Sequence, residues 1–497
     1  MKSSDLPRLE KVSPNKRKKV LLINPKKDTA AFSNAHNGLA MLATILKNRG
    51  HEVVVLDYLG IRKIENISIY SFIEKFKPDV VGMACYTPLA PFIYGIVAEI
   101  HARNPGLPVI LGGPHPTLYT EHVQKESGAD YILVGEAELT IIDTVENAKR
   151  ESEPKLVRAT ELTNLADMPL PDYTTFHEYK EIRGYSLMTA RGCPNKCNFC
   201  AVVALDSGRW RLRKVEDCIR ELETAKKTIS PHLYIGVIDD NPTVYKERFN
   251  EFLRQYVEKI KLPLFVTNTR ADGVTDEFIE LMKKCGCSGI AIGVEHAHPE
   301  VFKLIDKGET METIEKACRL IKKHNFGLIL TFIIGLPGDN LERVKASIEF
   351  AKKMKADDVS LNMMIPYKGT TARKWFDEQG IKIENEIGVD GQIRKRFECP
   401  EPFFETPDFS KKDREKAYYM FLLGVAHKKL KLRKIFKILQ VVKEYGLYSE
   451  FARWLPHGIM RSLENKKVLA KIAFDIYSRE GMQTLFKRYA LRNREMD

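Results

Sequence analysis

The chain has 497 residues, of which 44% are hydrophobic and 29% charged. This length predicts two to four domains, and the composition excludes a disordered protein. The longest apolar stretch, near residues 327–337, is too short to cross a membrane. Residues 1–19 are basic and polar without a secretory signal, and nine cysteines fit a reducing compartment, so we expect a cytoplasmic protein.

The positive charge is concentrated at the two ends of the chain. Residues 1–27 contain 9 Lys and Arg against 2 Asp and Glu, and residues 411–497 contain 21 against 9, within a net charge of +13. Such ends could bind lipid headgroups, nucleic acid or a phosphorylated substrate, although an ordinary Lys-rich surface explains them equally well. Nucleic acid is the least favoured partner, because no RNA-binding module accompanies the charge.

After a basic lead, residues 1–17, the segment 18–150 alternates strand and helix patterns with short joins. Such alternation indicates a parallel sheet with helices on both faces. Five strands in this length suit a flavodoxin-like doubly wound domain, whose ligand lies beyond the carboxyl ends of the strands. The strands are predicted at residues 19–24, 52–57, 79–85, 108–111 and 131–134.

Residues 151–184 contain Pro169 and Pro171 and few periodic apolar positions, which predicts a linker. A second series of six strand–helix units then occupies residues 185–375 and predicts another α/β domain. Its strands are predicted at residues 185–189, 233–238, 264–269, 289–294, 328–334 and 359–365.

The last part of the chain is predicted as a loop, residues 376–408, followed by a basic helical domain, residues 409–497. Within that domain residues 427–439 are basic and amphipathic. A helix of this kind can lie on an anionic membrane surface, which would make the protein peripheral to the membrane. Packing of its apolar side on the preceding domain, with the lysines in water, is the favoured alternative.

Three cysteines follow the first strand of the second series. Cys193, Cys197 and Cys200 share one tight loop. Iron–sulfur clusters are held by Cys thiolates, usually four of them, so three thiolates leave one iron open to a substrate or cofactor. The alternatives are an incomplete zinc site or buried cysteines, but a structural zinc site needs four ligands and no nearby Cys or His supplies an obvious fourth.

This loop resembles the C-x-x-x-C-x-x-C signature of the radical S-adenosylmethionine (SAM) superfamily. Residues 18–375 resemble the branch of that superfamily with an N-terminal cobalamin-binding domain. The resemblance implies a cobalamin-binding domain over residues 18–150 and a partial (β/α)6 barrel over residues 185–375. It also implies a [4Fe-4S] cluster on the three cysteines, SAM on the open iron, and an external electron donor such as flavodoxin or ferredoxin.

The same resemblance assigns residues at the strand ends to the cofactors, although each alone could be a turn or a helix cap. The expected SAM contacts are Asp239 and Asp240, which replace the usual Gly-Gly-Glu of the family, together with Asn268, Arg270, Glu295 and Tyr367. Three loops of the first domain resemble a cobalamin cradle, with expected contacts at Thr87, Gly112, Gly113, His115, Gly135 and Glu136.

The cobalt atom is expected to lack a histidine ligand from the protein. The Asp-x-His-x-x-Gly pattern that supplies one in other cobalamin proteins is missing after the first strand, and His115 fits a loop or nucleotide-tail contact better. Cys85 and Cys399 could take part in hydrogen or sulfur chemistry, but a structural role is favoured for both.

These implications predict an enzyme, most simply a methyltransferase acting on an unactivated carbon through a 5′-deoxyadenosyl radical and methylcobalamin. One alternative is an anaerobic radical cyclase or oxidoreductase of the same fold, acting on a tetrapyrrole or lipid-like substrate. Another is a non-catalytic cofactor-binding protein. Fold resemblance does not separate these possibilities, and the sequence names neither a catalytic side chain nor the small-molecule or lipid-like substrate.

Overall fold

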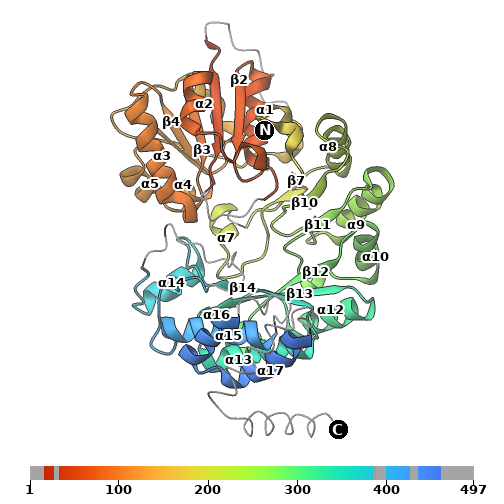
Figure 1. The fold of residues 1–497 in the computed structure, drawn as a ribbon. Coiled ribbons are helices and arrows are strands. Elements are labelled where there is room, and N and C mark those ends of the chain that lie inside the picture. Colours follow the sequence, from red (N-terminus) through yellow and green to blue (C-terminus); the bar gives the residue numbers. More distant parts are fainter. Residues whose placement is uncertain are drawn as a thin grey trace, which may run out of the picture.

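The computed structural model describes residues 16–26, 33–206, 208–384, 387, 399–425 and 435–460, without the side chains of 435–436 and 455–460. Figure 1 shows a layered N-terminal domain above a curved open sheet with helices on its outer side, and C-terminal helices below that sheet. Most of the predicted basic lead, 1–17, most of the basic stretch 427–439 and much of the predicted loop 376–408 lie outside the described residues.

The first domain is a parallel sheet in the order β2-β1-β3-β4-β5-β6. Apolar β1 residues from Val20 to Ile23 are almost fully buried, as expected for a strand covered on both faces. The strand order reverses between β1 and β3, which opens a crevice at the carboxyl ends of these strands. The strands are β1 (Lys19–Asn24), β2 (Glu52–Asp57), β3 (Val80–Ala84), β4 (Val109–Gly112), β5 (Tyr131–Val134) and β6 (Lys155–Arg158); the helices are α1 (Asn37–Arg49), α2 (Ile69–Phe76), α3 (Ala90–Arg103), α4 (Pro114–Leu118), α5 (Thr120–Glu126) and α6 (Ile141–Glu146).

The sixth strand of this sheet differs from the sequence prediction, which places residues 155–158 in a linker and expects five strands. β6 pairs in parallel with β5, with Lys155 opposite Tyr131 and Arg158 opposite Val134. It is an edge strand whose side chains are mostly exposed, so it lacks the apolar pattern of the inner strands. Farther along the same segment, Tyr173 and Phe176 are buried, so the connection packs on the domains.

The predicted partial (β/α)6 barrel is confirmed. Six parallel strands form two sheets, in the orders β11-β10-β7 and β12-β13-β14, and a parallel bridge between Thr269 and Ile292 joins them. Helices cover the outer side of this open barrel (Figure 1). The strands are β7 (Gly184–Leu187), β10 (Tyr234–Val237), β11 (Leu264–Val266), β12 (Gly289–Glu295), β13 (Gly327–Ile334) and β14 (Asp358–Met363); the helices are α8 (Val215–Thr228), α9 (Lys246–Gln255), α10 (Asp276–Lys284), α12 (Met311–Lys323), α13 (Leu341–Lys353) and α14 (Thr371–Glu378).

Four short elements of the barrel have no counterpart in the sequence prediction. They are the antiparallel pair β8 (Ala190–Arg191) and β9 (Arg211–Leu212), helix α7 (Ala201–Asp206) and helix α11 (Pro299–Leu304). The β8–β9 pair and α7 flank the cysteine loop, so they decide how that loop is held.

The loop between β1 and α1 docks on the first strand of the barrel. The backbone N–H of Ala35 donates to the carbonyl oxygen of Gly184 at 2.9 Å, and the side-chain amide of Asn37 donates to that of Ser186 at 3.2 Å. The side chain of Asn34 occupies the space that a Cβ would take at Gly184 and Gly236. These contacts set the carboxyl edge of the first sheet against the mouth of the barrel.

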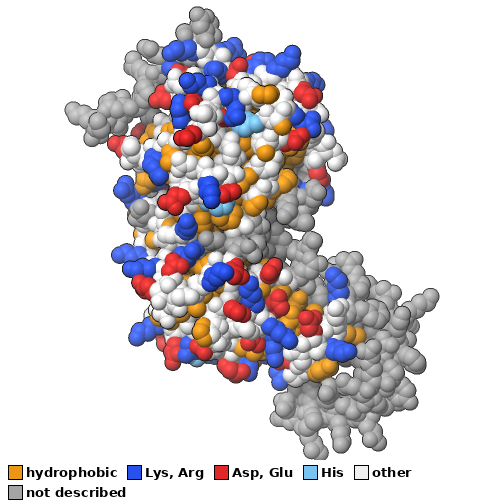
Figure 2. All heavy atoms as spheres, turned by 90° about the vertical axis from the view of Figure 1, so that its left-hand side faces the viewer, with side chains coloured by type: hydrophobic (Ala, Val, Ile, Leu, Met, Phe, Trp, Pro, Cys, Tyr) orange, Lys and Arg blue, Asp and Glu red, His pale blue; other side chains and the backbone are white. Residues whose placement is uncertain are grey.

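The C-terminal helices α15 (Lys411–Gly424), α16 (Ile435–Tyr445) and α17 (Tyr448–Met460) pack beneath the barrel (Figure 1). Ile438 and Val442 of α16 are buried, which supports packing as the role of this apolar side. No helix among the described residues is long and apolar enough to cross a membrane. The face drawn in Figure 2 carries Lys and Arg side chains interspersed with Asp and Glu.

Candidate functional site

A cavity of about 1130 Å³ lies between the carboxyl edge of the first sheet and the mouth of the barrel. Asn24, Met83 and Gly112 line it from strand ends of the first domain, and Asp240 and Ile365 line it from strand ends of the barrel. Parallel α/β sheets and barrels bind ligands at these ends of their strands. The two binding edges therefore open into one shared space.

The cysteine loop begins at a glycine in a left-handed backbone conformation. Gly192 has a φ of +82°, and a Cβ there would overlap the carbonyl oxygen of Arg209. Its N–H donates to Oδ2 of Asp240 at 2.9 Å, which holds the start of the loop against the end of β10. Only glycine combines this conformation with such a close backbone approach.

The three cysteines that follow are free thiols of intermediate burial. The side-chain amide of Asn195 donates to Sγ of Cys193 at 3.3 Å, and the N–H of Cys200 donates to the carbonyl oxygen of Cys197 at 3.1 Å. Burial raises the pKa of Cys197 to about 12 and that of Cys200 to about 11. Bound iron would offset this cost, because metal ligation favours the thiolate.

The donor set fits a cluster better than a single ion. Within the described ranges, no three His, Cys, Asp or Glu side chains are grouped to hold one metal ion. A four-iron cluster takes each thiolate on a different iron, so its ligands need not converge on one point. Cys193, Cys197 and Cys200, in one half-buried loop beside the cavity, therefore suit a cluster with one open iron.

The two adjacent aspartates at the end of β10 have different roles. Asp239 is buried, and its two carboxylate oxygens accept from the backbone N–H and the hydroxyl of Thr189 at 2.6 and 2.5 Å. Burial raises its pKa to about 6. Asp240 lines the cavity. Of this pair, Asp240 lines the cavity and Asp239 instead holds Thr189, and the expected SAM contact by Asp239 stays a prediction.

Asn268, Arg270 and Glu295 follow or end strands of the barrel but do not line the cavity. Asn268 and Glu295 adopt left-handed backbone conformations, with φ of +59° and +64°, and β12 shifts register at Glu295. Non-glycine residues are uncommon in this region and concentrate at functional sites. After burial, the largest influences on the pKa of Cys197 include its lowering by Lys307 and Arg270, so these charges lie near the cysteine loop.

Lys307 was missed by the sequence analysis. Its side chain is 5% exposed, and its ammonium lies 3.1 Å from Oε2 of Glu309 and 3.6 Å from Oε1 of Glu295. Arg270 donates to the carbonyl oxygen of Lys307 at 2.7 Å. Lys307 belongs to the connection after α11, where no motif marks it.

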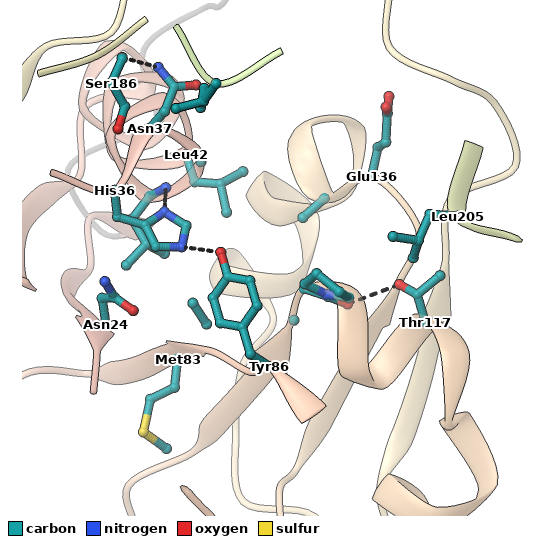
Figure 3. Close-up of a pocket in the computed structure, with 18 of the residues that line it drawn as sticks. Asn24, His36, Asn37, Leu42, Met83, Tyr86, Thr117, Glu136, Ser186 and Leu205 are labelled. Carbon is teal, nitrogen blue, oxygen red and sulfur yellow. Dashed lines mark hydrogen bonds between the residues drawn. The ribbon is translucent and has the colours of Figure 1, made fainter. Parts of the chain in front are cut away.

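Glycines form the part of the cavity wall that belongs to β4 and β5. Gly112, Gly113 and Gly135 all line the cavity. Gly113 has a φ of +108°, and a Cβ there would lie 3.1 Å from the carbonyl oxygen of Cys85. The hydroxyl of Thr117 accepts from the N–H of Gly135 at 3.0 Å and joins the two loops (Figure 3). Such a wall lets a broad, flat group approach the backbone closely.

Thr87 and His115 are buried beneath this wall and do not reach the cavity. The ring nitrogens of His115 bond to the hydroxyl of Tyr94 at 2.9 Å and that of Thr87 at 3.2 Å. Burial, with a contribution from His122, lowers the pKa of His115 to about 3. The side chains of Thr87 and His115 thus support the loops of the wall, and their predicted contacts with cobalamin stay predictions.

His36 and Tyr86 line the cavity at the switch point between β1 and β3, and the site prediction missed both. Nδ1 of His36 accepts from the N–H of Leu39 and caps α1, so a neutral ring carries its proton on Nε2. That nitrogen lies 3.0 Å from the hydroxyl of Tyr86 (Figure 3). His36 thus presents a donor rather than a lone pair, which makes it a poor cobalt ligand.

The remaining predicted positions divide in the same way. Tyr367 and Glu136 line the cavity. Cys85 is fully buried, whereas Cys399 lines the cavity on the barrel side, where its thiol donates to the carbonyl oxygen of Pro400 at 3.4 Å. The expected structural role thus suits Cys85 better than Cys399.

Both domains match known families. The radical SAM superfamily model matches residues 187–351, and the B12 binding domain model matches residues 27–144. An uncharacterized methyltransferase of Pyrococcus horikoshii is 29% identical over 391 residues, which are 72% of this chain and 82% of the relative. The anaerobic magnesium-protoporphyrin IX monomethyl ester cyclase of Rubrivivax gelatinosus is 25% identical over 402 residues, which are 74% and 71%.

A solved structure shares the fold. It is the radical SAM methyltransferase TsrM from Kitasatospora setae with cobalamin and a [4Fe-4S] cluster bound, with a TM-score of 0.60 and 18% identity. The match covers 73% of this chain and 75% of the solved chain.

Proposed function

The chain is a radical SAM enzyme with an N-terminal cobalamin-binding domain, and we propose that it is a methyltransferase acting on an unactivated carbon of a small molecule. The observation that carries this proposal is the single cavity between the two binding edges. A reaction that uses both cofactors needs them on opposite sides of one substrate, and this space offers that arrangement.

The residues that would hold each group follow from their places in the site. Cys193, Cys197 and Cys200 would ligate the cluster, and Asp240 and Tyr367 would contact SAM. The wall of Gly112, Gly113 and Gly135 would hold cobalamin. When bound, the cluster and SAM supply a radical that removes a substrate hydrogen, and cobalamin supplies the methyl group.

The chain's own residues give the cavity an apolar interior with few free charges. Leu42, Met83 and Leu205 are among the lining residues. Arg191 is the only Lys or Arg among the described residues of the lining, and its guanidinium lies 3.0 and 2.7 Å from the carboxylates of Glu136 and Glu138. The cavity therefore favours a largely apolar substrate over a phosphorylated one, because no described cation in its wall is left to bind a phosphate.

The second candidate is an anaerobic cyclase, which the similarity to the Rubrivivax enzyme supports. Labelled SAM separates the two. Under anaerobic conditions, protein with reconstituted cluster and reduced cobalamin would receive SAM labelled on its methyl group. We would then measure three products: labelled methylcobalamin, and unlabelled S-adenosylhomocysteine and 5′-deoxyadenosine.

A methyltransferase yields all three products. Deoxyadenosine without label on cobalamin would favour the cyclase, and none of the three would refute both candidates. Cys197→Ala should abolish deoxyadenosine formation. Cys287→Ala is the matched control, because Cys287 is a partly buried thiol outside the loop that donates to the carbonyl oxygen of Leu264.

Reduction of the cluster needs an external electron donor, and we propose a flavodoxin or ferredoxin, which cluster reduction by the purified donor would test. Membrane contact through residues 427–439 stays a prediction, since most of that stretch lies outside the described residues. Binding to anionic vesicles at low salt, and its loss at high salt, would support the contact; no binding at low salt would refute it.

A further inference from the structure

Two arginines of the β8–β9 pair hold one carboxylate of the first domain. Arg191 and Arg211 lie opposite each other in the antiparallel pair. Arg211 donates to the two carboxylate oxygens of Glu136 at 2.8 and 2.7 Å, and Arg191 lies 3.0 Å from the second of these oxygens. The three side chains are 17%, 9% and 19% exposed. Bidentate charged contacts of this kind are among the stronger polar contacts in proteins.

The carboxylate of Glu136 is fully occupied by protein groups. It also accepts from the backbone N–H of Thr163 at 2.6 Å. Although burial alone would raise its pKa, the hydrogen bonds from Arg211 and the charge of Arg191 lower it to about 2. Figure 3 shows the carboxylate turned away from Tyr86. The carboxylate of Glu136 therefore links the two domains.

This link joins the walls of the two cofactor sites. On one side, Gly135 and Glu136 belong to the loop after β5, which lines the cavity. On the other side, Arg191 is separated from Cys193 only by Gly192, whose conformation and close contacts leave the backbone little freedom. Cys193 and the loop after β5 are therefore connected through Gly192, Arg191 and Glu136.

We propose that Glu136 is a positioning residue that couples the cysteine loop to the loop after β5, so that the cluster and cobalamin each bind more tightly when the other is present. This inference rests on the proposed function. A cluster on the three cysteines would order the β8–β9 pair, and the ion pairs would then hold the loop after β5 in place. Cobalamin would meet a wall that is already ordered, which reduces the entropy cost of binding. The coupling is reciprocal by thermodynamic linkage.

The test measures the affinity of the full-length protein for hydroxocobalamin by anaerobic equilibrium dialysis, once with the cluster reconstituted and once after a chelator has removed it. We expect the cluster to lower the Kd at least about fivefold, the low end of couplings between sites. In Glu136→Gln, which keeps the side-chain length but removes the charge, the ratio of the two Kd values should fall to about one.

Glu146→Gln is the matched control. Glu146 is 10% exposed and bonds to Arg49 at 2.7 Å, but both residues belong to the first domain, so this variant should keep the wild-type ratio. Arg211→Gln changes the other side of the link and should also bring the ratio of the two Kd values to about one. The double variant with Glu136→Gln should show the same ratio as each single variant. If Glu136→Gln does not fold, Arg211→Gln gives the same test.

Three results would overturn the inference. A wild-type ratio of one would show that the sites are uncoupled, and an unchanged ratio in both Glu136→Gln and Arg211→Gln would show that the coupling takes another route. Failure of the wild-type protein to bind cobalamin in either form would instead refute the proposed function, and the inference with it.

Discussion

Acid should destabilise the first domain through His115, the buried histidine beneath the glycine wall. The pKa of this group falls from 6.5 in the unfolded chain to about 3 in the folded protein, chiefly because of burial. Between these values the unfolded chain binds a proton that the native protein does not, so stability is lost as the pH falls below 6.5. From pH 7 to pH 5 the loss from this one group is about 2 kcal/mol.

The variant His115→Gln removes the titration but keeps an amide that can both donate and accept. It can bond to the hydroxyls of Tyr94 and Thr87, which His115 contacts now. We expect the difference in free energy of unfolding between pH 7 and pH 5 to shrink by about 2 kcal/mol in this variant. Urea unfolding of the full chain, followed by circular dichroism at both pH values, measures that difference.

His324→Gln provides a control of opposite sign. Hydrogen bonds that His324 donates to the carboxylates of Asp276 and Glu280 raise its pKa, so its contribution is present at low pH and lost as the pH rises. The His324→Gln variant should therefore lose as much stability between pH 7 and pH 5 as the wild type, or slightly more. If the wild type and His115→Gln lose equal stability between pH 7 and pH 5, protonation of His115 is not the cause of that loss. A changed absorption spectrum of bound cobalamin in His115→Gln would contradict the placement of this residue outside the cavity.

Two further substitutions test the cysteine loop and the barrel. Gly192→Ala should lose the cluster, seen as lost iron and visible absorbance, because a Cβ at this φ of +82° would overlap the carbonyl oxygen of Arg209; unchanged iron content would contradict this. Arg213→Met should cost about 3–5 kcal/mol in urea unfolding, because it leaves the buried Glu221 carboxylate, 2.6 Å away, without its cation. Arg254→Met removes an exposed ion pair of the same length, which solvent screens, so it should lower the free energy of unfolding far less; equal losses in the two variants would count against this explanation.

The sequence predicts the long elements of both domains well, because each carries a strong local pattern. The strands at residues 19–24, 52–57 and 131–134 have the predicted bounds, and the predicted barrel strands at residues 289–294 and 328–334 differ from β12 and β13 by one residue. β6 was not predicted because an edge strand exposes most of its side chains and so lacks an apolar pattern. β8 and β9 were not predicted because two residues are too few to show an alternating pattern. Local sequence patterns therefore predict a strand poorly when it is very short or lies at the edge of a sheet.

The site was predictable as a set of strand ends but not residue by residue. Asp239 and Asp240 are indistinguishable in sequence, yet the alternation at the end of β10 buries one against Thr189 and turns the other to the cavity. His36 gave no signal, because its capping of α1 and its contact with Tyr86 depend on the fold. Glu136 was predicted because it follows a strand of the first domain, but its ion pairs are with Arg191 and Arg211 of the barrel domain, which the sequence did not indicate.

Magnetic interaction between the cluster and cobalamin would show whether the two cofactor sites face one cavity. With the cluster and cobalamin each reduced to a paramagnetic state in the same protein, electron paramagnetic resonance should show split or broadened signals that depend on both being present. A spectrum equal to the sum of the two separate spectra, in protein shown to contain both cofactors, would contradict the shared cavity.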